Sequence, residues 1–145
     1  MCFAVVKVSQ VRPGESGFSL VLLPQKVHLR LEVGRPGAGT DAPVTRMVSI
    51  VAGDETGIIR VVLFDKDEST VFSGPDGALT TLPIVLRNCY AHIFEGHIEL
   101  RVIEGVGSLS ILEKETAGVP APPTTINSAL DVSKNIWEAT RLTLP

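Results

Sequence analysis

The stretch Ala52–Asp65, AGDETGIIRVVLFD, contains the pattern that decides the fold. Its first half, GDETG, has the Asp and Gly residues of a tight turn, and its second half alternates between the two faces of an extended strand. One face is apolar and contains Ile59, Val61 and Leu63. The other face contains Arg60, which belongs in water, and therefore Phe64 as well. The pattern predicts a hairpin whose second strand turns Phe64 away from the core.

The composition is that of a folded globular domain. The chain has 145 residues, of which 44% are hydrophobic and 20% are charged, which is enough apolar material for a single core. The formal net charge is -3. Any binding to nucleic acid must therefore come from a local basic face and not from the total charge.

Several other classes of protein are disfavoured by the motifs that the sequence lacks. Cys2 and Cys89 do not have the spacing of a zinc site, so we expect no metal and no cofactor, and two cysteines are too few for a disulfide scaffold. There is no phosphate-binding loop, nucleophile elbow, zinc-protease or dinucleotide motif, so we expect no enzyme. Without a signal peptide or a membrane-length apolar run, we expect a nuclear or cytoplasmic protein that does not contact membranes.

Short segments rich in Val, Ile and Leu, cut by Gly, Pro and Asp, predict a mostly β chain. The expected strands are Phe18–Val33, Val44–Ala52, Ile58–Asp65, Leu82–Phe94 and Ile98–Glu104, with shorter extended pieces at Phe3–Val8 and Ser108–Leu112. A long loop follows the first strand, and a polar connection with a short helical turn separates the third strand from the fourth. This all-β arrangement indicates a five-stranded OB-fold barrel.

The first strand alternates along its second half. Val27, Leu29 and Leu31 are expected to face the core, and His28 and Arg30 to face the solvent.

The composition of the chain changes towards its C-terminus. We assign residues 1–115 to the OB-fold domain, 116–127 to a Pro-rich linker and 128–145 to a helix that contains Trp137 and is capped by Asn127 or Ser128. The helix either packs on its own barrel or associates with another chain, a second copy included, and the sequence leaves both arrangements open.

Aromatic and basic side chains gather on the outer face of the predicted barrel. In the fourth strand, Cys89, Ala91 and Ile93 are expected in the core. The alternate residues of the fourth and fifth strands then face out with Arg60 and Phe64: Asn88, Tyr90, His92, Phe94, His97, Glu99 and Arg101. Exposed rings interleaved with arginines suit single-stranded nucleic acid, because bases stack on rings and guanidinium groups contact phosphates. The high β-propensity of aromatic residues, or a protein-binding patch, would produce the same pattern.

Three segments also resemble a known family. They are VSQVRPGESGFSLVLLPQKV (8–27), VAGDETGIIRVVLFD (51–65) and LRNCYAHIFEGHIEL (86–100). In this order they resemble the replication-protein-A-like OB-fold proteins that bind single-stranded DNA, which include the B subunit of the sensor-of-single-stranded-DNA complex. The match runs from about Lys7 to Leu112.

The resemblance implies a DNA-binding groove across the second and third strands. It places Phe64 where the family usually has a base-stacking Trp, and Tyr90 and Phe94 at other base-stacking aromatic positions. Arg101 stands where close relatives often have a further aromatic residue.

These observations together predict a protein that binds single-stranded DNA with little sequence preference, in DNA replication or repair. The predicted nucleic-acid-binding residues are Phe64, Tyr90, Phe94, Arg60, Arg101, His92, Arg46 and Asn88. Arg60 and Arg101 are expected to contact phosphates, with Arg46 and Arg30 as further candidates for that role. Two alternatives stay open. One is binding to single-stranded RNA, because stacking does not distinguish the two sugars. The other is a protein-interaction subunit of a larger complex, which the sequence pI of about 5.6 favours.

Overall fold

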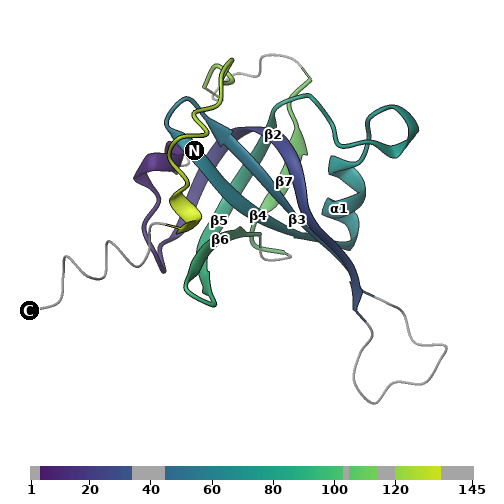
Figure 1. The fold of residues 1–145 in the computed structure, drawn as a ribbon, viewed down its shortest axis with the longest axis horizontal. Coiled ribbons are helices and arrows are strands. Elements are labelled where there is room, and N and C mark those ends of the chain that lie inside the picture. The colour runs from purple at the N-terminus through teal and green to yellow at the C-terminus, as the bar shows by residue number, and fades with distance from the viewer. Residues whose placement is uncertain (1–3, 34–44, 103–104, 114–119, 135–145) are drawn as a thin grey trace, which may run out of the picture.

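The computed structural model describes residues 4–33, 45–102, 105–113 and 120–134 (Figure 1). Its elements, in chain order, are β1 (Ala4–Val5), the 3-10 helix η1 (Val8–Gln10), β2 (Ser16–Val33), β3 (Thr45–Asp54), β4 (Gly57–Phe64), α1 (Asp65–Val71), the 3-10 helix η2 (Pro75–Gly77), β5 (Ile84–Phe94), β6 (His97–Arg101), β7 (Ser108–Ile111) and the 3-10 helix η3 (Val132–Lys134).

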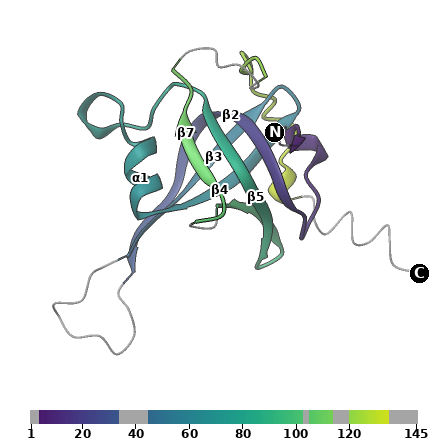
Figure 2. The same ribbon diagram turned by 180° about the vertical axis from the view of Figure 1, so that it is seen from behind.

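The strands form one closed sheet. Their order is β1-β2-β3-β4-β6-β5-β7, and an additional pairing of β2 with β5 closes the sheet on itself. Pairing is antiparallel except between β1 and β2 and between β4 and β6. The five predicted strands correspond to β2 to β6, while β1 and β7 add short strands beside β2 and β5. In Figure 1, β3 and β4 are nearest the viewer. In the reversed view of Figure 2, β5 and β7 are nearest the viewer.

The core fills the inside of this sheet. Ile59, Val61 and Leu63 are at most 1% exposed, which confirms the alternation predicted for β4. Short helices lie at the two ends of the sheet, α1 at one end and η1 with η3 at the other (Figure 1). They contribute Val71, Val8 and Val132 to the main core cluster.

A bulge in β5 decides which of its side chains enter the core. Asn88 has a φ of 54°, in the left-handed region, and the pairing of β5 with β2 is irregular around it. Beyond the bulge, Cys89 and Ala91 are 1% exposed, as predicted. The prediction for Ile93 is wrong: it is 50% exposed, because the pairing of β5 with β2 ends at Tyr90 and the β5–β6 hairpin projects beyond it.

The predicted orientation of the second half of β2 is also wrong. Val27, Leu29 and Leu31 are 42–43% exposed. Irregularities in the β2–β3 register change which side chains share a face. Arg30 instead points towards α1, where its Nε donates to Glu68 Oε1 at 2.9 Å and its guanidinium carbon lies 4.1 Å from the centre of the Phe72 ring.

Residues 127–134 do not form the start of the predicted C-terminal helix. They make a turn, a parallel bridge between Asp131 and Ile58, and the single turn of η3. A helix is not formed here because the backbone bonds to the sheet instead: Leu130 O accepts from the Ile58 N–H at 2.8 Å, and the Asn127 N–H donates to Asp54 O. The remainder of the predicted helix, including Trp137, lies outside the described residues.

Ser133 joins this segment to two strands at once. Its hydroxyl donates to the carbonyl of Ile98 on β6 at 2.6 Å and accepts from the Arg60 N–H on β4 at 2.9 Å. Ser133 is fully buried. The hydroxyl therefore bridges β4 and β6 near their beginnings.

Candidate nucleic-acid interface

The pairing register places the predicted binding residues in rows across the outer face of β3, β4, β6 and β5. One row contains Ser49, Val62, Arg101 and Tyr90, and the next contains Val51, Arg60, Glu99 and His92. Met47, near the start of β3, and Phe64, at the end of β4, form a further row. The sheet thus brings Phe64, Arg101 and Tyr90 into one surface from three different strands.

Phe64 is the last residue of β4 and is 37% exposed, so the prediction that it faces out is confirmed. Its cross-strand neighbour is Met47, whose neighbour on β2 is Leu31. Leu29 precedes Leu31 on the same side of β2. Phe64 is therefore part of an apolar patch formed by Leu29, Leu31, Met47 and Phe64, which the sequence prediction missed because it placed both leucines in the core.

Arg101 lies between two aromatic residues. Its guanidinium carbon is 5.9 Å from the centre of the Phe64 ring, within the range of a cation–π contact. Tyr90 is its cross-strand neighbour on β5. Arg101 also forms an ion pair with Glu99, with Nη2 3.1 Å from Oε2. Glu99 is on the outer face as predicted, but it is only 7% exposed.

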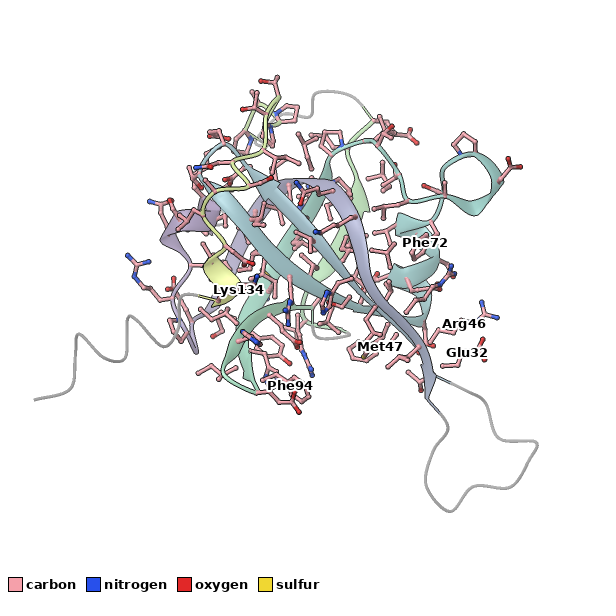
Figure 3. The ribbon with its side chains drawn as sticks, in the orientation of Figure 1. Glu32, Arg46, Met47, Phe72, Phe94 and Lys134 are labelled. Carbon is pink, nitrogen blue, oxygen red and sulfur yellow. The ribbon has the colours of Figure 1, made fainter. Side chains whose placement is uncertain are left out.

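The other aromatic positions extend the surface along β5. The rings of Tyr90 and His92 meet edge to face, 5.9 Å apart and at 81°. Phe94 is 48% exposed and pairs with His97 in the projecting hairpin (Figure 3). It is separated from Phe64 by the two rows that contain Arg101 and Glu99, so the hairpin forms the far end of the surface.

The side chains of three predicted polar residues differ in their bonding partners. Arg60 is partly exposed, and its side chain has no hydrogen-bond or ion-pair partner within the described segments. Arg46 is exposed beside Glu32, with 4.0 Å between Nε and Oε1, on the opposite side of β3 from Met47 (Figure 3). Asn88 donates from its side chain to the carbonyl of Val106, so its amide supports the turn before β7.

A cavity of about 510 Å³ adjoins Phe64 between the end of β4, α1 and β7. Val62, Val102 and Leu109 give it apolar walls, and its charged lining residues are Asp65, Lys66 and Asp67.

The described parts of the chain contain no cluster of three or more His, Cys, Asp or Glu side chains that could hold a metal ion. Nor do they contain a helix of sufficient length and apolar character to cross a membrane.

Comparison with solved structures identifies the fold as an OB-fold. A hypothetical protein from Arabidopsis thaliana has a TM-score of 0.60 and 22% identity, over 88% of this chain and 81% of that one. The second OB-fold domain of replication protein A from Methanococcus maripaludis has a TM-score of 0.52 and 20% identity, over 77% of this chain and 98% of that domain.

A replication protein A heterotrimer bound to single-stranded DNA contains a chain with a TM-score of 0.58 and 11% identity, over 90% of this chain and 33% of that one. A scan of protein-family models finds none that matches, and a search of curated proteins finds no significant match. The chain is therefore similar to these proteins in fold.

Proposed function

We propose that this chain is a non-enzymatic OB-fold protein that binds single-stranded DNA with little sequence preference, in DNA replication or repair. The observation that supports it best is the surface formed by Phe64, Arg101 and Tyr90 on three neighbouring strands. The resemblance of three sequence segments to single-stranded-DNA-binding proteins, and the DNA-bound heterotrimer of similar fold, also support it.

In this proposal the side chains have two kinds of role. Phe64, Tyr90 and Phe94 stack on bases, while the apolar patch of Leu29, Leu31, Met47 and Phe64 extends the surface towards β2. Arg60 contacts phosphates, because it is partly exposed on the same face as these rings. Arg46 is on the opposite side of β3 from Met47, so we assign it no contact with a strand bound to this face. Arg30 has no such role, since Glu68 and Phe72 hold it against α1.

The test is the affinity for a fluorescent single-stranded oligonucleotide, measured by anisotropy. Each stacked base contributes about 1–3 kcal/mol, so the double variant Phe64→Ala/Tyr90→Ala is expected to bind roughly thirtyfold more weakly or worse. Leu82→Ala is the matched control, because Leu82 is a similarly exposed apolar residue outside the surface. Unchanged affinity in the double variant would refute the stacking roles.

A protein-interaction subunit is the second candidate. The observation that favours it is the exposed apolar pair on β2, Leu29 and Leu31, each 43% exposed beside Met47. If the protein binds no oligonucleotide and the variant Leu29→Asp/Leu31→Asp loses a co-purifying partner, this candidate replaces the first. Titrating single-stranded DNA and single-stranded RNA in parallel distinguishes the two nucleic acids.

A further inference from the structure

Glu99 lies in the middle of the outer face and is nearly buried. It is 7% exposed, with Arg60 as its neighbour on β4 and His92 as its neighbour on β5. A carboxylate withdrawn from water requires a charged or hydrogen-bonded partner. That partner is Arg101, which lies two residues further along β6 on the same face and donates from Nη2 to Glu99 Oε2 at 3.1 Å.

This bond holds Arg101 down on the sheet. Its side chain is 24% exposed, whereas that of Arg46 is 60% exposed. Arg101 Nε is buried and has no hydrogen-bond partner within the described part of the chain. The guanidinium group therefore lies at the level of its neighbours, Phe64 and Tyr90, and does not extend above them towards solvent.

Glu99 engages only Nη2 of Arg101, but raising the guanidinium group to a phosphate above the rings would separate it from Glu99. The carboxylate would then remain nearly buried without its partner, which is strongly unfavourable. Arg60 is not constrained in this way, because its side chain has no partner among the described residues. A planar guanidinium group that stays on the surface is well suited to stack against a base.

We propose that Glu99 is a positioning residue that holds Arg101 between Phe64 and Tyr90, so that Arg101 contacts nucleobases and not phosphates. The three side chains then form a continuous base-contacting line across β4, β6 and β5, and Arg60 provides the nearest phosphate contact. This inference rests on the proposed binding of single-stranded DNA and revises the expectation that Arg101 meets a phosphate.

The test compares a single-stranded oligonucleotide with an abasic strand of the same length, which retains the phosphates but has no bases. Arg101→Gln is expected to weaken binding to the normal strand about tenfold and to leave binding to the abasic strand unchanged. Arg60→Gln is expected to weaken binding to both strands. It should also lower the slope of log K against log salt by about 0.7, the value for one phosphate contact on a single strand, whereas Arg101→Gln should leave that slope unchanged.

Two further variants separate the position of the cation from its charge. In Glu99→Gln, the ratio of affinities for the normal and abasic strands should fall about as far as in Arg101→Gln. Affinity for the abasic strand should be retained or increased, because a negative charge is removed. Arg101→Lys keeps the charge without the planar group, so it should show the same low ratio as Arg101→Gln. Thermal unfolding of each variant checks that it is folded.

Three results would overturn the inference. The first is a lower salt slope in Arg101→Gln, which would make Arg101 a phosphate contact. The second is a wild-type affinity ratio in Glu99→Gln, which would remove the positioning role. The third is a wild-type ratio in Arg101→Lys, which would show that charge alone suffices. A wild-type protein that binds neither strand would instead refute the proposed function, and this inference with it.

Discussion

Replacing Val132 by Ala tests whether the segment that ends in η3 is part of the folded core. Val132 is 7% exposed and belongs to the main core cluster, although it is 31 residues beyond the end of β6. The substitution removes two buried methyl groups, at about 0.8 kcal/mol each, and leaves a small cavity. The expected loss in free energy of unfolding is therefore about 2 kcal/mol.

Urea denaturation measures this loss. With a slope of about 2 kcal/mol per molar urea, the unfolding midpoint of Val132→Ala should fall by roughly 1 M at unchanged slope. Lys134→Ala is the control in the same segment: its ion pair with Asp131 is exposed, so its loss should be below about 0.5 kcal/mol. If Val132→Ala also loses less than that, Val132 does not pack in the core and the reasoning about this segment is refuted.

Two further predictions concern ionisable groups. The Lys7 side chain lowers the pKa of Glu55 below 4.5, so Lys7→Ala should lose stability at neutral pH. In urea titrations this loss should disappear as the pH falls through the lowered pKa. An equal loss at neutral pH and below that pKa would contradict the prediction. Burial raises the pKa of Cys89 to about 12. In a Cys2→Ser variant, a thiol reagent at pH 8 should therefore label the protein only after denaturant is added. Rapid labelling of the native protein would show that Cys89 is accessible.

Alternation along a strand was sufficient to predict the faces of β4, because an arginine on one side and three apolar residues on the other leave a single choice. It was not sufficient for β2. There the register irregularities place Arg30 on the face nearer the core, where Glu68 and Phe72, about 40 positions later in the chain, hold its side chain. The exposed leucines then become part of the candidate binding surface, a result that no local pattern contains.

The same limit applies at the C-terminal side. Asn127 and Ser128 are good helix-capping residues, so the local sequence favours a helix. The structure instead bonds this backbone to the β3–β4 hairpin, because Asp54 at the end of β3 and Ile58 at the start of β4 offer hydrogen-bonding groups. The candidate stacking residues were predictable from their spacing in the sequence. The proposed role of Glu99 depends on its burial and on its distance from Arg101, which only the structure supplies.

The bridge made by Ser133 has a consequence for how the protein is made. Because ribosomes synthesise chains from the N-terminus, β4 and β6 are complete before the residue that joins them has been added. Contacts between Ser133 and Arg60 span 73 positions, and contacts so distant in sequence form late and slowly. A nascent chain that has released only the strands can pair β4 with β6 through their backbones, but it lacks this side-chain link until the segment around η3 has emerged.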